Sequence, residues 1–408
     1  MTALDDAITA RGPGAGSVVS IENQLITQLS DRLCATDAVE LTEGGSPARL
    51  FRLQTPDGQS IVLKVLVDVP GAVDGHDLAS FRVKIGQILK IRREVPELRS
   101  VYTDLCDQFH GKNWSAYTMP YYESVDIGAS LRPDGIDPER FWSDMTQVLS
   151  DLLSFGYLRS AVSVGVGHIN SVHMDRLARR FWVLRKYLPG DLCDADVIVI
   201  NGVRCRNPLG LALAMADSDL THRIDPQRLY YPVHGDLNMR NILVTEDRYR
   251  VIDPRGTIHH WDPAYDIAKL LFSLTVWDAA MRRGFNIGRG REWSIGVRGG
   301  RYQGYRNAAS QLVPQLRSLS GFGELTAGDS GWESRVLLGH AFHTLAEAAC
   351  RLSAAKKRTG EAGDCQFTPL ELAVGHYLYG VLFLEDAVRQ LEMEGAIDTE
   401  ATLSLLDL

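Results

Sequence analysis

The spacing of apolar residues changes several times along the chain, and each change predicts a different element. Near the N-terminus, Ile21, Leu25 and Leu29 recur at every fourth position, which predicts a helix with Ser20 as its N-cap. The residues before this helix, 1–18, are small and contain several glycines, and we expect them to form a flexible tail.

Apolar and polar positions alternate over residues 38–67. A Gly-Gly-Ser loop and the turn sequence TPDGQ interrupt this alternation, so the segment predicts three antiparallel strands. Helical spacing returns over 77–95. The stretch 114–124 then predicts a strand that continues into an extended link, because Pro120 has no N–H to donate to a sheet.

Beyond residue 124 the pattern becomes mainly helical, except in a motif-rich stretch at 230–274 and a stretch rich in Arg and Gly at 282–306. We therefore predict a small, strand-rich N-lobe over 19–123, with a hinge at about 119–123, and a large helical C-lobe over 124–408. A binding site is expected in the cleft between them.

Composition limits the classes of function. The chain has 408 residues, a net charge of -8 and a pI of about 5.8, which argues against nucleic acid as a partner. Its apolar runs are too short to cross a membrane, and its N-terminus is acidic where a signal peptide would be basic. The six cysteines form no CxxC pair, so we expect reduced core thiols and a cytoplasmic protein, of an oligomeric state that the sequence leaves open.

The stretch 230–274 places carboxylates and amides beside short apolar segments. NILV and YRVID predict a hairpin, which would bring Asn241 at its entry close to Asp253 at its exit. Hard oxygen donors in this arrangement suit Mg²⁺. Asp236 lies five residues before Asn241 and can face the same cleft as an acceptor-only carboxylate. The alternative is that Asp236 and Asn241 only cap turns.

The spacing within this stretch is specific to a known fold. HGDLNMRN at 234–241, followed by ID at 252–253, resembles the catalytic loop and metal-binding Asp of the protein-kinase-like fold. Gly235, where protein kinases usually carry Arg, is similar to the aminoglycoside phosphotransferase and choline kinase family. WDPAYDIAKLL at 261–271 resembles the helix start of that family, and IDPRG resembles a subgroup of bacterial small-molecule or sugar phosphotransferases.

The resemblance implies an α+β, bilobal fold and a kinase that phosphorylates a hydroxyl group of a sugar, amino sugar, amino alcohol or antibiotic-like acceptor. ATP or GTP would be the phosphoryl donor. Asp236 would orient the acceptor hydroxyl and take up its proton, and Asn241 and Asp253 would hold Mg²⁺ on the nucleotide phosphates. Asp262 and Asp266 would support the catalytic loop.

A kinase also needs a nucleotide pocket in the N-lobe. Lys64 is the only charged residue in an otherwise apolar strand, so it needs a partner such as phosphate, unless it is a solubility lysine on an edge strand. The helix after it offers only Asp77 and Glu94 as acids to orient Lys64. The remaining predicted nucleotide contacts are Val62 over the base, Gly44, Gly45 and Ser46 around the phosphates, and Pro120 and Tyr122 at the hinge.

Three alternatives remain at this point. A protein kinase is disfavoured because only eight residues separate Asp253 from Asp262. A catalytically inactive binding module is disfavoured because the residues that the reaction needs are all present: Lys64, Asp236, Asn241 and Asp253. Residues 282–306 contain seven Arg and seven Gly against one acid, which would suit nucleic acid, a solvated hairpin or an acceptor-binding role. If they bind the acceptor, it should be anionic or highly hydroxylated, and Arg289 and Arg291 should contact it.

Overall fold

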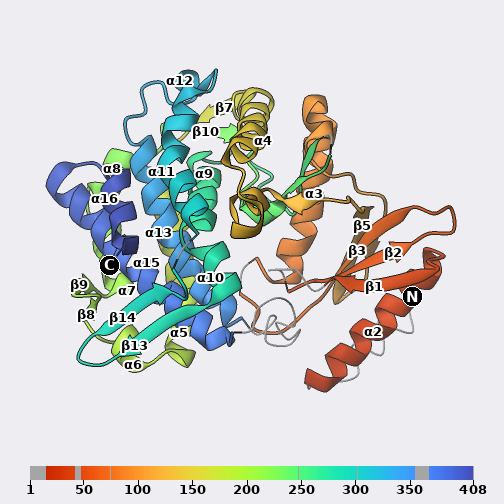
Figure 1. Ribbon diagram of the computed structural model, residues 1–408, viewed down its shortest axis with the longest axis horizontal. Helices are drawn as coiled ribbons and strands as arrows, with labels where there is room; N and C mark the ends of the chain where they lie inside the picture. The colour runs from red at the N-terminus through yellow and green to blue at the C-terminus, as the bar shows by residue number, and fades with distance from the viewer. Residues whose placement is uncertain are drawn as a thin grey trace.

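The computed structural model describes residues 15–41, 47–73, 75–246, 248–300, 302–353 and 367–407. Its strands and helices divide into two lobes: a small one with a five-stranded sheet and a much larger one built mainly of helices (Figure 1). The predicted fold class, α+β with an antiparallel sheet in the N-lobe and a helical C-lobe, is confirmed.

The N-lobe sheet is antiparallel throughout, in the order β1-β2-β3-β5-β4. Its strands are β1 (Asp37–Leu41), β2 (Arg49–Gln54), β3 (Ser60–Val67), β4 (Gln108–His110) and β5 (Trp114–Pro120). The three strands predicted over residues 38–67 are therefore confirmed.

Two helices cover this sheet, α2 (Ala15–Arg32) and α3 (Leu78–Glu94). Because side chains alternate along a strand, Leu63 and Val65 of β3 pack in the same cluster as Leu25 of α2. The opposite face of β3 packs against α3 and carries Lys64. The start of α2 differs from the prediction: the helix already includes 15–18, which were expected to belong to the tail, and the cap predicted at residue 20 is wrong.

The C-lobe is organised around two long helices, α13 and α15, which pack against each other, and α13 also packs against α9. Its helices are α4 (Pro138–Asp151), α5 (Asp175–Tyr187), α6 (Gly190–Cys193), α7 (Pro208–Ala216), α8 (Leu220–Ile224), α9 (Ala264–Phe272), α10 (Asp278–Arg283), α11 (Gln303–Ser318), α12 (Phe322–Leu325), α13 (Trp332–Arg351), α15 (Pro369–Glu394) and α16 (Thr399–Ser404). Short helical turns of other pitch lie at Pro96–Ser100, Ile127–Leu131, Pro133–Gly135, Leu152–Tyr157, Asn170–Met174, Met239–Asn241, Ser273–Trp277 and Leu405–Asp407.

Three small sheets complete the C-lobe, in the orders β10-β7, β12-β11-β6 and β13-β14-β8-β9. Their strands are β6 (Val125–Asp126), β7 (Ser160–Ser163), β8 (Val197–Ile200), β9 (Val203–Arg206), β10 (Arg228–Tyr231), β11 (Ile242–Val244), β12 (Tyr249–Val251), β13 (Phe285–Arg289) and β14 (Trp293–Val297). The hairpins predicted at NILV/YRV and in the Arg-rich stretch are both confirmed. The pairing of β7 with β10 and the extension of the second hairpin by β8 and β9 were not predicted, because these strands are short and separated in sequence.

Two further expectations concern the whole chain. No helix in the described residues is long and apolar enough to cross a membrane. Cys193, Cys205 and Cys350 are buried free thiols, as expected, but Cys34 and Cys106 are exposed. The exposed thiols lie at a helix end and in a loop before an edge strand, where local spacing gives no information on burial.

Candidate active site

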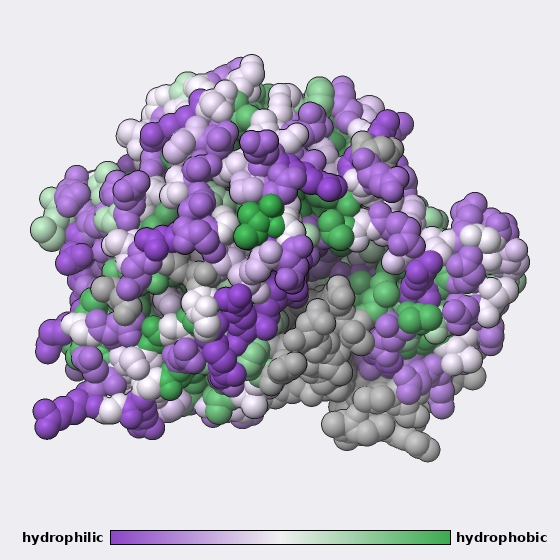
Figure 2. Space-filling model, viewed as in Figure 1, coloured by the Kyte–Doolittle hydropathy of each residue, from purple (hydrophilic) through white to green (hydrophobic). Residues whose placement is uncertain are grey.

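A cleft between the lobes is lined by residues of the N-lobe sheet, helix α3, the loop at 234–241, and helices α5, α9 and α13. Leu50, Tyr117 and Met119 supply apolar walls on the N-lobe side. Figure 2 shows a hollow between the lobes, with hydrophilic side chains gathered over α10 beside it. The charged residues that line the cleft are Lys64, Lys84, Arg176, Arg180, Asp236, Arg240, Asp253, Arg255, Lys269, Glu347 and Arg351.

The loop at 234–241 has a conformation that requires glycine at its second position. Gly235 has φ of +79°, and a Cβ there would lie 2.8 Å from Cβ of Arg255 and 3.0 Å from a methyl carbon of Thr257. An arginine at this position, as in protein kinases, would meet the same two side chains. The local backbone therefore explains the glycine on which the family resemblance depends.

Asp266, at the start of α9, accepts hydrogen bonds from the backbone of this loop. One carboxylate oxygen accepts from the His234 N–H (2.9 Å) and from the Tyr157 hydroxyl (2.9 Å), and the other accepts from the Gly235 N–H (2.6 Å). Burial raises the pKa of Asp266 to about 7, and these three donors oppose the rise. Asp262 supports the same helix start, since it accepts from the N–H of Ala264 (3.0 Å).

His234 is a buried link between the loop and the strand β12. One ring nitrogen accepts from the Asp236 N–H (3.1 Å), and the other lies 3.0 Å from the Ile252 carbonyl, so the second nitrogen carries the proton. Burial lowers the pKa of His234 to about 4. A neutral imidazole with both nitrogens engaged orients Asp236 and is not available as a base.

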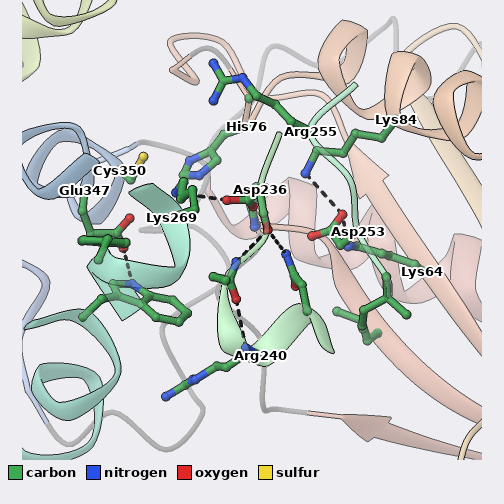
Figure 3. Close-up of a pocket in the computed structure, with 18 of the residues that line it drawn as sticks. Lys64, His76, Lys84, Asp236, Arg240, Asp253, Arg255, Lys269, Glu347 and Cys350 are labelled. Carbon is green, nitrogen blue, oxygen red and sulfur yellow. Dashed lines mark hydrogen bonds and ion pairs between the residues drawn. The ribbon is translucent and has the colours of Figure 1, made fainter. Parts of the chain in front are cut away.

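Asp236 projects into the cleft, where its carboxylate lies 3.0 Å from the Lys269 amine (Figure 3). Burial would raise the pKa of Asp236, but the charges of Lys269 and Lys84 outweigh burial and lower it. The carboxylate is therefore ionised at neutral pH and can accept a proton or a hydrogen bond from a hydroxyl group.

Asn241 is fixed beside Asp236 by the chain itself. Its side-chain amide N–H donates to the backbone carbonyl of Asp236 (2.9 Å). Its backbone carbonyl accepts from the Ile252 N–H (2.9 Å). Because the amide nitrogen is engaged, the side-chain oxygen is the atom that remains to bind a cation. Ile252 immediately precedes Asp253, so the hairpin register brings Asn241 next to the second oxygen ligand predicted from the sequence.

Asp253 lies opposite Asp236 in the cleft and contacts two lysines (Figure 3). Its carboxylate is 2.9 Å from the Lys64 amine and 3.2 Å from the Lys84 amine. Burial alone would raise the pKa of Asp253, but the two ammonium groups depress it well below its usual range. Lys64 is itself buried on a central strand, so it is not an edge-strand solubility lysine.

The partner of Lys64 differs from the expectation that an acid of the following helix would orient it. Asp77 instead caps α3, accepting from the Ser80 N–H (2.8 Å). Glu94 lies at the other end of α3, 3.8 Å from Lys90. Lys84, in the middle turn of α3, lines the cleft, and the carboxylate that it contacts is that of Asp253.

The middle of α3, between the two expected acids, carries a glutamine that contacts the C-lobe. The buried side chain of Gln87 accepts from the N–H groups of Gly256 (2.5 Å) and Thr257 (2.8 Å) and donates to the Val233 carbonyl (2.8 Å). These contacts attach α3 to the segments on both sides of the loop at 234–241. Gln87 therefore fixes the N-lobe helix relative to Asp236 and Asp253.

The other predicted nucleotide contacts lie around the N-lobe sheet. Val62 is buried on the Lys64 face of β3 and packs among apolar residues, outside the cleft lining. Pro120 ends β5, and the Tyr122 hydroxyl lies 3.3 Å from that of Thr103; neither residue lines the cleft, whereas Met119 does. The positions Gly44, Gly45 and Ser46 fall outside the described residues.

Several residues that line the cleft, and Gln87 beside it, were missed by sequence reasoning. Lys84 and Gln87 share a face of α3 with apolar residues, and polar residues on such a face are a usable signal that was overlooked. Arg176 and Arg180 sit one turn apart on α5, where arginines are typical of a solvated helix face, but both are buried. The Arg-rich hairpin, in contrast, does not line the cleft: Arg289 pairs with Asp191 (2.9 Å) elsewhere on the C-lobe.

The residues of the cleft allow a test of the predicted magnesium site. Among the described residues, no cluster of three or more His, Cys, Asp or Glu could hold a metal ion without further ligands. An amide oxygen and one carboxylate facing the same space are a partial set of ligands. Such a set fits Mg²⁺, which completes its coordination with phosphate oxygens and water.

A small antiparallel sheet over a helical lobe, with an HGD loop in the intervening cleft, defines the protein-kinase-like class of fold. Residues 204–305, which include this loop and Asp253, match the model of the phosphotransferase enzyme family. The match confirms the family resemblance predicted from the sequence, and with it an enzyme that transfers a phosphoryl group.

Other comparisons give more distant similarities. No match was found among curated proteins. Similar solved structures include a proposed fructosamine-3-kinase from Haemophilus somnus 129PT, with 9% identity, a TM-score of 0.47, and coverage of 88% of this chain and 96% of that chain. A type VIII aminoglycoside-3'-phosphotransferase has 14% identity, a TM-score of 0.46, and coverage of 78% and 98%. ADP-bound aminoglycoside phosphotransferase APH(2'')-Ib has 12% identity, a TM-score of 0.43, and coverage of 89% and 98%.

Proposed function

We propose that this protein is a cytoplasmic small-molecule kinase, which transfers the γ-phosphate of ATP or GTP to a hydroxyl group of a sugar, amino sugar, amino alcohol or antibiotic-like acceptor. The observation that carries the proposal is the position of Asp236. It is an ionised carboxylate in a cleft whose other side presents Lys64, Lys84 and Asp253. This juxtaposition suits phosphoryl transfer, which depends on positioning and charge neutralisation.

The proposal gives a role in the reaction to each of five cleft residues. Asp236 orients the acceptor hydroxyl group and takes up its proton as the new P–O bond forms. Lys64 and Lys84 supply positive charge for the nucleotide phosphates. Asn241 and Asp253 would hold Mg²⁺, which would neutralise charge on the phosphate oxygens when bound.

The N-lobe contacts predicted from the sequence remain part of the proposal. Val62 would lie near the base, Pro120 and Tyr122 would bind it by their backbone groups, and the Gly-Gly-Ser loop at 44–46 would cover the phosphates. Met119 joins this set because it lines the cleft on the strand that leads to the hinge.

A protein substrate is less compatible with the segment between Asp253 and α9. Over 254–261, the Arg255 N–H donates to the His234 carbonyl (3.0 Å), and Trp261 exchanges two backbone hydrogen bonds with Tyr230 (both 2.8 Å). A short segment that is bonded to the loop at one end and to strand β10 at the other has no length available to form a peptide-binding platform. This favours a small acceptor.

The proposal can be tested by measuring binding of ATP and GTP with Mg²⁺ and with a chelator, followed by nucleotide turnover against a panel of sugars, amino alcohols and antibiotics. We expect Mg²⁺-dependent binding and turnover that an acceptor stimulates. Nucleotide binding without turnover on any acceptor would favour the inactive binding module. Absence of nucleotide binding would contradict the proposed function as a whole.

A further inference from the structure

Arg240 lies in the loop at 234–241, between the proposed catalytic residue Asp236 and the proposed metal ligand Asn241. In Figure 3 its side chain extends away from Asp236. The Nε atom of Arg240 donates to a carboxylate oxygen of Asp278 (2.8 Å), and its guanidinium group lies 5.0 Å from the centre of the Trp277 ring. The loop that carries the proposed reacting groups is therefore attached to the C-lobe core by an arginine of its own.

The carboxylate that holds Arg240 is completely buried. Asp278 begins α10, and one of its oxygens accepts from Arg240. The other oxygen accepts from Nε of Arg282 (2.9 Å) and from the Tyr305 hydroxyl (2.5 Å). Burial would raise the pKa of Asp278, but the charges of Arg240 and Arg282, with the hydrogen bond from Tyr305, outweigh burial and lower it to about 2. Asp278 is therefore ionised and holds Arg240 through a charged hydrogen bond.

A second carboxylate, Asp126 of β6, contacts the other arginines around Asp278. It pairs with Arg132 and with Arg282 (3.6 Å). These two arginines also contact Asp278, at 3.8 and 2.9 Å. Strand β6 pairs with β11, which begins directly after Asn241. The two carboxylates and their arginines therefore hold the chain on both sides of Asn241.

Hydrogen bonds within the loop connect the position of Arg240 to that of Asp236. The Arg240 N–H donates to the side-chain oxygen of Asn238 (3.1 Å), and the side-chain amide of Asn238 donates to the backbone carbonyl of Asp236 (3.3 Å). The same carbonyl accepts from the side-chain amide of Asn241 (2.9 Å). A shift of Arg240 would therefore displace the residues that present the carboxylate and the amide oxygen to the cleft.

We infer that Arg240 is a positioning residue of the proposed kinase: Asp278 fixes its guanidinium group, and the fixed arginine holds Asp236 towards the acceptor hydroxyl group and Asn241 towards the metal. Phosphoryl transfer depends on such placement, and a displacement of about 1 Å can lower a rate about 100-fold. This inference rests on the proposed function and adds a residue that acts on the reaction through its neighbours.

Arg282 provides a matched control for Arg240. Both arginines donate from Nε to Asp278, at 2.8 and 2.9 Å, and their side chains are 18% and 24% exposed. Arg282 lies on α10, however, and does not line the cleft. Replacement of either arginine by methionine removes one positive charge and one bond to the same buried carboxylate. Only the replacement of Arg240 releases the loop.

The test compares Arg240→Met with Arg282→Met in the full chain. Calorimetry would measure affinity for ADP with Mg²⁺ and with a chelator, and steady-state kinetics would measure kcat with ATP and an acceptor from the panel of sugars, amino alcohols and antibiotics. We expect Arg240→Met to lower kcat by about 10–100-fold and to reduce the gain in ADP affinity that Mg²⁺ provides, with ADP affinity in the chelator unchanged. Arg282→Met should keep kcat and this gain close to their wild-type values.

Urea unfolding separates positioning from a role in stability alone. Each substitution removes one charged partner of Asp278, so both should lower the unfolding midpoint, whereas only Arg240→Met should lower kcat. Arg240→Lys keeps the charge without the forked geometry and should lose less kcat than Arg240→Met. If Arg240→Met does not unfold cooperatively, Arg240→Lys is compared with Arg282→Lys. Equal kcat in the two variants of a pair, or losses of kcat that follow the midpoint in both, would overturn the inference.

Failure of the inference is distinguishable from failure of the proposed function. Wild-type protein that binds nucleotide and phosphorylates an acceptor, while folded Arg240→Met does so equally well, would contradict only the positioning role. Wild-type protein that does not bind nucleotide would contradict the kinase function from which the inference starts.

Discussion

Two sides of the cleft are assembled in different ways: the side formed by β3 and the segment after β12, called the nucleotide side after its proposed role, and the side formed by α5 and α13, called the acceptor side after its proposed role. On the nucleotide side, Lys64 and Asp253 each stand at the end or centre of a short strand, and a hairpin and a sheet bring them together. On the acceptor side, Arg180 and Arg351 come from helices α5 and α13, which are distant in sequence and meet only through core packing. The comparison shows that local motifs position the residues of the first side, whereas long-range packing positions the arginines of the second.

The largest expected effect is on phosphoryl transfer, in a variant that should leave nucleotide binding unchanged. Asp236→Asn should reduce phosphoryl transfer by about 10²–10⁴-fold, because the amide occupies the same space but cannot accept the hydroxyl proton. Nucleotide affinity should remain close to that of the wild type, since Asp236 lies across the cleft from Lys64 and Asp253. Steady-state kinetics and nucleotide titrations check both parts; turnover near the wild-type rate would remove Asp236 from the catalytic role.

On the nucleotide side, we expect Asp253→Asn to weaken nucleotide binding in the presence of Mg²⁺ by at least about tenfold, because it removes the only anionic ligand of the proposed metal site. In a chelator, the same variant should bind nucleotide as well as or better than the wild type, since Lys64 and Lys84 lose their carboxylate partner. Asn241→Ala should show the Mg²⁺-dependent loss only, and to a smaller extent.

Titrations with and without chelator provide the measurement. If wild-type nucleotide affinity is the same in both, the assignment of Asn241 and Asp253 to the metal is wrong. If Asp253→Asn loses affinity equally in both, the residue supports the pocket and does not bind the metal.

The sequence predicted much of the nucleotide side because its signals are local. Alternating apolar residues gave β1, β2 and β3, the turn in the hairpin brought Asn241 toward Asp253, and a lone charge in an apolar strand marked Lys64. The partner of Lys64 was predicted wrongly as Asp77 or Glu94. The actual carboxylate lies far along the chain, and spacing within one helix contains no information about it.

The acceptor side could not be predicted in the same way. The most prominent arginines in the sequence, at 282–306, form a hairpin away from the cleft, where Arg298 pairs with Glu371 (2.8 Å). The arginines that line the cleft are buried because α13 packs against α5, and this contact follows from tertiary structure alone. A count of charges in a segment therefore did not locate the arginines that line the cleft.

The link between the two sides can be tested at Gln87. Gln87→Met keeps a similar volume but leaves the N–H groups of Gly256 and Thr257 without their acceptor in a buried place. We expect the free energy of unfolding to fall by about 1–3 kcal/mol, with a further loss of activity because α3 is no longer attached to the catalytic loop. Urea denaturation would measure the first effect, with exposed Gln147→Met on α4 as the control. Equal effects of the two substitutions would contradict a positioning role for Gln87.

The smallest expected effect is a change in pH dependence on the acceptor side. Lys269 contacts the carboxylate of Asp236 and lowers its pKa, so Lys269→Met should raise that pKa. Methionine preserves the apolar stem near the ring of Phe272, from whose centre the Lys269 amine lies 5.1 Å.

Because the proposed reaction needs the ionised form of Asp236, activity should be lost at a higher pH in Lys269→Met than in the wild type as the solution is acidified. At alkaline pH, where Asp236 is ionised in both proteins, the pH-dependent difference should disappear. Profiles of kcat/KM against pH measure the shift, with exposed Lys186→Met on α5 as the control for loss of one positive charge. An acid limb at the same pH in wild type and Lys269→Met would show that Asp236 does not control the reaction, or that Lys269 does not set its ionisation; turnover of Asp236→Asn decides between these two explanations.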